Sequence, residues 1–392
     1  MENSVNIEQQ NQKISMVLDK KEREEFLKGC RFCPMCQVID RVGSIVCRES
    51  YTPRGRAVIL EAAEKGLIEW DDTVADIIYT ALNDGLAREW CVSNYDYEEL
   101  IIDARARIFK RGKAPISVVR FLESFRGNPK KIASPAEILS KTHTRLTPSA
   151  DVLLFCGCKA RESNHSVITA MGRLFNHVGV KFRVLDNEPC CGWPFYQLGH
   201  FEGAKEFSVN ISKAIREAGV STVAVLDADC FRMLTTRNTR FGGNLYGINI
   251  VNAISLIWEW VQKGLLKVTH PIADSVTYHD PCAYARYCED TDTPRKMLKN
   301  ISSGDLKEMA TNRKMANCCG AGGMMYVHRP DIAEKVALLR FQEAKATSAS
   351  LLVTGCPGCD VALASIKATH EEGGPKIMNL IELVAMAAGT LE

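Results

Sequence analysis

The sequence SVTYHDPCAYARY at residues 275–287 joins an apolar, strand-like stretch directly to a cysteine. The same layout occurs 124 residues earlier, where DVLLFCGC at residues 151–158 also runs from an apolar stretch into cysteine. Double cysteines stand at 190–191 and 318–319, and further cysteines follow at 230 and 359, with offsets of 128 and 129 residues. These matching landmarks predict an internal duplication of one structural unit.

Each copy alternates strand-like and helix-like patterns. Strands are expected at 181–186, 221–227 and 350–356, and helices over about 162–178, 201–218 and 329–346. This alternation predicts an α/β fold with parallel sheets. Because the carboxyl ends of parallel strands meet at one edge of a sheet, where ligands bind, we expect the cysteines that follow the strands to gather there.

The first part of the chain has a different pattern. After a polar tail, predicted as flexible over 1–20, helices are expected near 56–64, 71–90 and 95–112, while 113–148 has the composition of a connecting segment. The predicted organisation is a helical domain over 21–125, a first α/β domain over 126–270 and a second over 271–392.

Composition narrows the class of protein. The 392 residues include 49 Lys+Arg and 47 Asp+Glu, and the small net charge of +2 does not favour binding to nucleic acid. No apolar run reaches the ~20 residues of a spanning helix, and the N-terminus lacks a signal-peptide pattern. We therefore expect a cytoplasmic protein without membrane insertion. Since cytosolic thiols stay reduced, the 16 cysteines indicate metal binding rather than disulfides.

The second copy carries a set of five cysteines that suits an iron–sulfur cluster. Thiolates are the usual ligands of such clusters, and the glycine run 320–323 allows backbone N–H groups to approach the sulfurs. A structural zinc site is the alternative, but zinc prefers four ligands in short pairs. The five cysteines are Cys282, Cys318, Cys319, Cys356 and Cys359.

Longer motifs around these cysteines resemble the CCG domain of the heterodisulfide reductase family. They are YHDPCAYARY followed by DTPR (278–295), NCCGAGG (317–323) and TGCPGCDVAL (354–363). The resemblance covers about 151–392 and implies that the five cysteines hold a non-cubane [4Fe-4S] cluster. These cysteines are then the candidate catalytic residues, together with His279, which is either a proton donor or a structural histidine.

The first copy departs from this pattern. Asp227 stands where the family has the first cysteine of its Cys-x-x-Cys pair. The four remaining cysteines, Cys158, Cys190, Cys191 and Cys230, are enough for a cubane cluster, or the site binds nothing. Both readings stay open.

The N-terminal motif Cys30-x-x-Cys33-x-x-Cys36 matches the start of a two-cluster ferredoxin motif, C-x2-C-x2-C-x3-C-P, whose fourth cysteine ligates the other cluster. Asp40 occupies that fourth place. Cys91, in REWC, resembles the fourth cysteine of a second motif, but IYTALNDGLAREW (78–90) lacks its three partners.

We therefore predict one [4Fe-4S] cluster on Cys30, Cys33, Cys36 and Cys91, a deleted second cluster, and Cys47 as the competing fourth ligand. The segment also resembles the ferredoxin-like part of the glycolate oxidase iron–sulfur subunit, including TPRGR at 52–56. The family resemblance thus extends over about 25–392.

This resemblance implies an iron–sulfur oxidoreductase subunit that passes electrons between the ferredoxin-like cluster and the CCG cluster. The implied partner is a flavoprotein subunit of the FAD-linked oxidase type, acting on a 2-hydroxy acid such as glycolate or lactate, or another redox subunit. The chain has no Gly-x-Gly-x-x-Gly after a strand and no Walker motif, so we expect no nucleotide site of its own. The alternatives are a heterodisulfide reductase-like catalytic subunit, against which Asp227 counts, and a zinc-bound scaffold.

Overall fold

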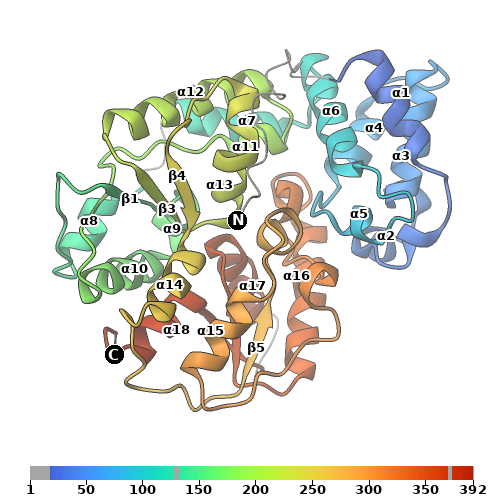
Figure 1. Ribbon diagram of the computed structural model, residues 1–392. Helices are drawn as coiled ribbons and strands as arrows, with labels where there is room; N and C mark the ends of the chain where they lie inside the picture. Colours follow the sequence, from blue (N-terminus) through green and yellow to red (C-terminus); the bar gives the residue numbers. More distant parts are fainter. Residues whose placement is uncertain (1–17, 128–131, 370–372, 392) are drawn as a thin grey trace.

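A computed structural model describes residues 18–127, 132–369 and 373–391 (Figure 1). The predicted tail 1–20 lies outside the described residues except for its last three, of which Asp19 caps the first helix. No helix in these described ranges is both long and apolar enough to cross a membrane.

The N-terminal part, blue to cyan in Figure 1, is helical. Several of its helices begin at a side-chain cap that accepts a backbone N–H, as Asp19, Thr52 and Asp71 do, which compensates for the unpaired donors of a first turn. Its helices are α1 (Lys20–Gly29), α2 (Arg41–Val46), α3 (Pro53–Glu64), α4 (Asp72–Tyr79), α5 (Leu86–Trp90), α6 (Tyr97–Lys110) and α7 (Ile116–Gly127).

Two expectations for this region were wrong. The helix predicted over 71–90 is two helices, α4 and α5, because Asn83 and Gly85 adopt positive φ values of 50° and 85° that end a right-handed helix. The predicted connecting segment 113–148 contains α7 and α8 (Pro135–Ser140).

The first α/β unit contains a four-stranded sheet in the order β2-β1-β3-β4, with every neighbouring pair parallel. Residues Val152–Phe155 pair in register with Thr222–Val225. Its elements are β1 (Val152–Phe155), α9 (Cys158–Ser163), α10 (His165–His177), β2 (Phe182–Arg183), α11 (Trp193–Gln197), α12 (Phe201–Glu217), β3 (Thr222–Val225), α13 (Ala228–Arg232), β4 (Asn249–Asn252) and α14 (Ala253–Gln262).

The second unit has a three-stranded parallel sheet in the order β5-β6-β7. A single bridge between Val276 and Leu306 stands where the first unit has its short edge strand β2. Its elements are β5 (Val276–His279), a π-helical turn (Ala283–Tyr287), α15 (Thr293–Ile301), a 3-10 turn (Gly322–Val327), α16 (Pro330–Ala346), β6 (Leu351–Thr354), α17 (Pro357–Thr369), β7 (Lys376–Asn379) and α18 (Leu380–Ala387).

The duplication predicted from the cysteine spacing is confirmed by these elements. Helices α12 and α16 each contain 17 residues, and an asparagine side chain, Asn252 or Asn379, accepts a first-turn N–H of α14 and of α18. The predicted fold class, a helical N-terminal part followed by two parallel-sheet α/β units, is therefore correct.

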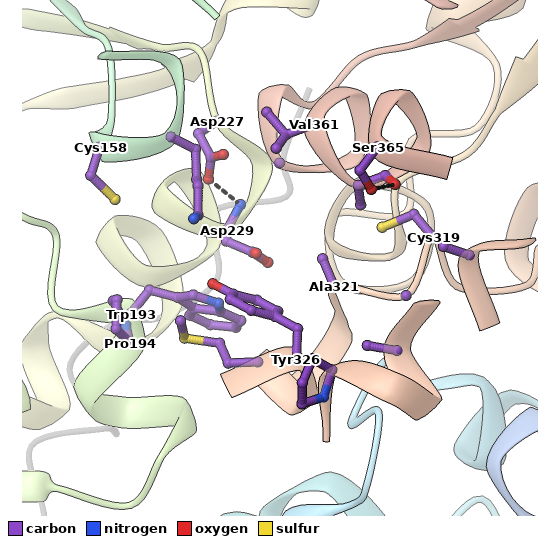
Figure 2. Close-up of a pocket in the computed structure, with 18 of the residues that line it drawn as sticks. Cys158, Trp193, Pro194, Asp227, Asp229, Cys319, Ala321, Tyr326, Val361 and Ser365 are labelled. Carbon is purple, nitrogen blue, oxygen red and sulfur yellow. Dashed lines mark hydrogen bonds between the residues drawn. The ribbon is translucent and has the colours of Figure 1, made fainter. Parts of the chain in front are cut away.

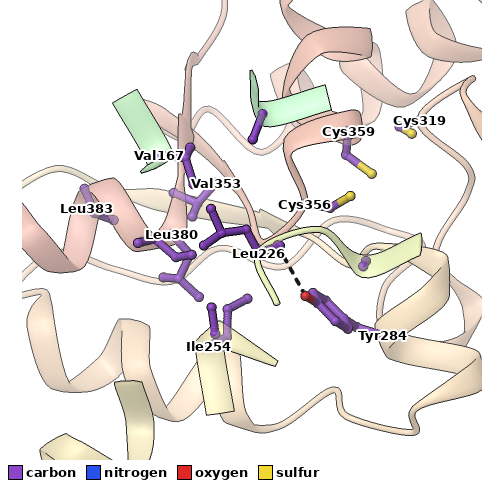
Figure 3. Close-up of a cluster of buried hydrophobic side chains, with 14 of the residues drawn as sticks. Val167, Leu226, Ile254, Tyr284, Cys319, Val353, Cys356, Cys359, Leu380 and Leu383 are labelled. Atoms are coloured by element: carbon purple, nitrogen blue, oxygen red, sulfur yellow. Dashed lines mark hydrogen bonds between the residues drawn. The ribbon is translucent and has the colours of Figure 1, made fainter. Parts of the chain in front are cut away.

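The two α/β units share one hydrophobic core. Leu226 and Ile254 of the first unit pack in the same cluster as Val353, Leu380 and Leu383 of the second (Figure 3). The two units approach closely at Gly355, where a Cβ atom would lie 2.4 Å from Ile254 Cδ1 and would force that side chain to move. Since this burial is apolar and continuous, the units behave as one body rather than as two tethered domains.

Arg105 on α6 joins the N-terminal part to both α/β units. It is fully buried and donates five hydrogen bonds, all to backbone carbonyls. Nη1 reaches Gln197 O at 2.9 Å in the first unit and Gly323 O at 2.8 Å in the second. The other three acceptors, Ile78 O, Tyr79 O and Ala81 O, belong to the end of α4 and the loop after it.

Replacing Arg105 with methionine should lower the free energy of unfolding by at least about 3 kcal/mol, because several buried carbonyls lose charge-assisted hydrogen bonds while the apolar stem is kept. The urea concentration at half-unfolding measures this change. Arg120→Met, on the exposed face of α7, is the matched control and should shift the midpoint little. Equal midpoints for the two variants would contradict the role given to Arg105.

Candidate metal centres

The four cysteines predicted for the ferredoxin-like cluster lie around one cavity. Cys30 ends α1, Cys33 and Cys36 follow in the loop, and Cys91 ends α5. Burial raises the pKa of Cys36 to about 11 and also raises that of Cys30, so a bound cation would be needed to ionise these two thiols at pH 7. Four converging thiols are the donor set of a [4Fe-4S] cluster, and the residues present fit that group.

The TPRGR sequence shapes this site. Thr52 caps α3 and Pro53 occupies its first turn, so the helix begins beside the cysteine loop. The backbone N–H of Arg54 lies against Cys36 and acts to lower its pKa, opposing the larger effect of burial. Gly55 is required because a Cβ atom would lie 1.9 Å from Glu49 O. Arg56 is buried and donates to the carbonyls of Ile77 and Thr80.

Cys47 lies apart from these thiols. It is exposed, ends α2 with a φ of 56°, and its Sγ donates to Ser44 O at 3.2 Å. Among the residues lining the cavity of the N-terminal cysteines, Cys47 does not occur. The geometry therefore favours Cys91 over Cys47 as the fourth ligand.

A second cavity adjoins the first and lies where the ferredoxin spacing would place the ligands of a second cluster. Counting back from Cys91 with the ferredoxin spacing gives positions 81, 84 and 87, now Ala81, Asp84 and Ala87. All three line this cavity together with Asp40, the lost fourth ligand of the first motif. The ferredoxin spacing alone is sufficient to locate these positions in the sequence. The sequence prediction noted only that three cysteines are absent and did not assign the positions.

The same cavity reaches the second α/β unit at Cys318. It shares Pro53, Ala87 and Tyr97 with the cavity of the N-terminal cysteines. The N-terminal thiol site and the second α/β unit are therefore separated by one small polar cavity.

Three of the five cysteines of the second unit follow the ends of its strands, and Cys318 and Cys319 lie in the loop before the 3-10 turn Gly322–Val327. Cys282 comes three residues after β5, Cys356 comes two after β6, and Cys359 lies in the first turn of α17. Figure 3 shows the sulfurs of Cys356 and Cys359 on the side facing Cys319. Cys318 Sγ accepts the N–H groups of Gly320 and Gly322, each at 3.3 Å, as expected for the glycine run. The donor set fits an iron–sulfur cluster.

His279 lies against this set. Its side chain and the sulfurs of Cys319 and Cys359 form a group of ligand atoms within 4.8 Å of one another. Nδ1 accepts from Arg340 Nε at 2.9 Å. Because arginine only donates, neutral His279 carries its proton on Nε2, which has no other partner and points this donor at the sulfurs.

Hydrogen bonding and burial set the charge of these groups. Hydrogen bonds from Cys318, Cys359 and His279 hold the pKa of Cys319 well below its ordinary value. Burial lowers the pKa of His279, so the ring is neutral at pH 7. The site is thus arranged to stabilise negative charge on Cys319.

Two arginines of the same motif, Arg286 and Arg295, are structural. Arg295 pairs with both oxygens of Asp280, at 2.7 and 2.9 Å, and Arg286 donates to the backbone carbonyls of Lys314, Asp84 and Ala316. Both are buried. Neither guanidinium is available to an anionic ligand.

The four cysteines of the first unit also lie together. Cys191 and Cys230 have their sulfurs 3.2 Å apart, and Cys158 and Cys190 contact each other through hydrogen-bonding side chains. Cys156 is instead fully buried in the core, and its backbone N–H donates to Glu188.

Asp227 lies between the cysteines of its own unit and those of the other unit. Its Oδ1 caps α13 by accepting the N–H groups of Asp229 and Cys230, at 3.0 and 2.9 Å. Its Oδ2 lies 3.8 Å from Cys356 Sγ in the other unit. The residue that replaces a thiol in the first site therefore contacts the corresponding thiol of the second.

A cavity of about 400 Å³ opens between the two cysteine sets (Figure 2). Cys158, Cys191 and Cys230 line it from the first unit, and Cys319 lines it from the second. Trp193, Pro194 and Val361 give it an apolar wall, while Lys159 and Tyr326 approach each other across the boundary between the units. The volume is that of a small-molecule site.

The choice between Cys91 and Cys47 is directly testable. Cys91→Ser should remove the cubane signal from electron paramagnetic resonance spectra of the reduced protein, since its sulfur lines the N-terminal cavity. Cys47→Ser, an exposed residue outside that cavity, should leave the signal unchanged. Loss of the signal only in Cys47→Ser would reverse the assignment.

The comparisons with known proteins agree with this geometry. The model of the cysteine-rich CCG domain matches twice, at residues 152–235 and 276–364. A solved structure of a hypothetical protein from Helicobacter pylori superposes with a TM-score of 0.59 at 12% identity, covering 95% of this chain and 73% of that one, and supports the fold alone.

Curated relatives include a subunit of a heterodisulfide reductase and a probable iron–sulfur-binding oxidoreductase. A component of the dihydromethanophenazine:CoB–CoM heterodisulfide reductase of Methanosarcina barkeri is 28% identical, over 62% of this chain and 61% of that protein. Its counterpart in Methanosarcina acetivorans is 27% identical, over 80% and 78%. The probable iron–sulfur-binding oxidoreductase FadF of Bacillus subtilis is 28% identical over 60% of this chain but only 34% of its own length. The chain therefore carries two CCG cysteine-rich domains and is homologous to this heterodisulfide reductase component, FadF and other iron–sulfur oxidoreductases.

Proposed function

We propose that this chain carries electrons from a [4Fe-4S] cluster on Cys30, Cys33, Cys36 and Cys91 to a non-cubane [4Fe-4S] cluster on the five cysteines of the second CCG domain. The observation that supports this proposal is the sequence of adjoining cavities. The N-terminal thiol cavity shares residues with the polar cavity, the polar cavity reaches Cys318, and the neighbouring Cys319 opens into the large cavity.

The clusters would supply the electron transfer, and the residues of the chain would bind and tune them. The glycine N–H groups at Cys318 and the Nε2 proton of His279 donate to sulfur, which stabilises the reduced, more negative state of a cluster. Arg340 keeps the proton of His279 on the nitrogen that faces the thiols. The N–H of Arg54 would act in the same way at Cys36.

We propose a flavoprotein as the electron donor or acceptor, of the FAD-linked type that oxidises a 2-hydroxy acid such as glycolate or lactate. The chain has no nucleotide motif, and its relatives are subunits of larger enzymes. Large apolar side chains are also exposed around the N-terminal thiol site, where a partner would dock: Phe32, Met35, Val38, Trp90 and Val92.

Anaerobically purified protein should contain about eight irons per chain, from two four-iron clusters, and about twelve if the first CCG domain also binds one. Metal analysis measures the count. Affinity purification from the native host should recover a flavin-containing subunit with the chain. Near-stoichiometric zinc with little iron would instead support the zinc-bound scaffold.

The large cavity favours a second function, reduction of a disulfide. Thiols from both CCG domains border a space that can hold a small organic molecule, so a substrate disulfide could lie beside Cys319. We propose this as the alternative reaction of the chain. Asp227 weakens it, because the first domain lacks one ligand of a complete five-cysteine set.

A cavity-filling variant separates the two functions. Val361→Trp places an indole in the cavity and should lower kcat/KM for a small synthetic disulfide, 2-hydroxyethyl disulfide, at least tenfold. Reduction of the clusters by a viologen dye should not change, because the cysteine ligands are untouched. Val209→Trp, on the exposed face of α12, is the control. Disulfide turnover by the wild type that Val361→Trp leaves unchanged would place the reaction outside this cavity.

A further inference from the structure

The polar cavity between the N-terminal thiol site and Cys318 is lined by residues that electron transfer alone does not explain. Its volume is about 20 Å³, enough for one water molecule. Two of the four lost ligand positions around it are now carboxylates, Asp40 and Asp84. Glu98 on α6 and Asn83 in the loop before α5 also line it.

Glu98 and Asn83 are buried without complete hydrogen bonding. Glu98 is 2% exposed, and neither of its carboxyl oxygens has a partner. Asn83 is 6% exposed. Its amide nitrogen donates to Gln197 Oε1 at 3.2 Å, whereas its Oδ1 has no partner. Unpartnered buried polar groups are costly, and a cavity of this size that contains several of them is a site for bound water.

The water would have both donors and acceptors. Asn83 Oδ1 accepts, the buried Nε of Arg41 donates without another partner, and Glu98 can do either when it is protonated. Burial raises the pKa of Glu98 to about 8, with Asp96 adding to the effect, so the acid form predominates at pH 7.

A metal ion suits this cavity less well than water. Among the described residues, only His279, Cys319 and Cys359 form a group of three ligating side chains whose ligand atoms lie within 4.8 Å of one another. The carboxylates of this cavity form no such group and therefore do not converge on one point. Arg56 and Arg41 also line the cavity and would repel a cation.

We propose that Glu98 and Asn83 bind a water molecule in this cavity and that Glu98 passes protons through it to the second CCG centre at Cys318. The inference rests on the proposed function, since it assumes that this centre is reduced. The outer end of the route is formed by Asp96 and Arg88, which are half-buried beside Glu98. The charged or titratable groups around Glu98 are Asp96, Arg88, Asp84, Asp40, Arg41, Arg56, Tyr97, Tyr287 and Cys318.

Such a route has a chemical purpose at this centre. Reduction of a disulfide consumes two electrons and two protons and yields two thiols. The electrons would come from the N-terminal cluster and the protons from solvent. Glu98 would release its proton to the water, which passes one on towards Cys318, and would take another from the solvent side, so that the carboxyl group is unchanged after each transfer.

The test is the rate at which a viologen dye reduces the second CCG cluster, measured by rapid mixing without substrate in H₂O and in D₂O. In the wild type the rate should be lower in D₂O, because a proton reaches the centre together with the electron. In Glu98→Gln, which keeps the shape but cannot release a proton, the rate should fall at least tenfold. The equilibrium midpoint potential should stay the same, since the route sets how fast protons arrive and not how many are bound. Glu89→Gln, on the adjacent α5 but outside the cavity, makes the same substitution and should keep the wild-type rate.

A second measurement does not need the cluster. Because folded Glu98 keeps a proton between its ordinary pKa and about 8 that the unfolded chain releases, stability falls as pH rises through this window. That decline should be smaller in Glu98→Gln than in Glu89→Gln. Clusters that are reduced as fast in Glu98→Gln as in the wild type would overturn the proton route alone. Absence of the clusters from the wild type would overturn the proposed function.

Discussion

The arrangement of the centres depends on one interaction, the hydrogen bonding of the charged Arg105 side chain to backbone carbonyls. Its five acceptors come from the end of α4, the loop after α4, and one loop of each CCG domain. Burial lowers its pKa to about 10, so it stays charged at pH 7, and carbonyl dipoles stabilise that charge without a carboxylate. The loop held at Ala81 lines the polar cavity, and the loop held at Gly323 follows Cys318 and Cys319. One side chain thereby fixes the spacing between the N-terminal site and the second CCG site.

The duplicated fold explains why the two CCG sites differ in chemistry while sharing one cavity. Each unit presents its cysteines at the carboxyl ends of its strands, and the apolar core joins the units so that these ends face each other. Equivalent positions then meet across the boundary, as Asp227 and Cys356 do. A substitution in one copy therefore changes the surroundings of the other. Asp227 removes a thiol from the first site and adds a carboxylate beside the second, which disfavours the thiolate of Cys356.

Local patterns in the sequence were enough to predict the strands that end at cysteines, the long helices α12 and α16, and the grouping of Cys91 with the N-terminal motif. They could not reveal Arg105, because its acceptors are backbone carbonyls distant in the sequence and carry no side-chain signature. The break between α4 and α5 was missed for a related reason: residues 71–90 are helical in pattern, and the left-handed turn at Asn83 and Gly85 is stabilised by contacts with distant loops. The burial of Glu98 could not be predicted either, since an acidic residue in the first turn of a helix is usually solvated.

If the ferredoxin-like part lacks a second cluster, as the sequence predicts, the missing ligands are better understood as replaced than as deleted. Asp40 now caps α2 by accepting the N–H of Gly43, and Asp84 accepts the N–H of Leu86 at 3.2 Å and lies 3.6 Å from Arg286. These carboxylates stabilise the backbone that a cluster would otherwise hold, so restoring one cysteine would remove such a contact without completing a ligand set. The space at these positions is polar and lies between the two proposed cluster sites. Under the proposed function, the place where the ferredoxin spacing would put an electron carrier has the composition of a proton carrier, and both would serve the same centre.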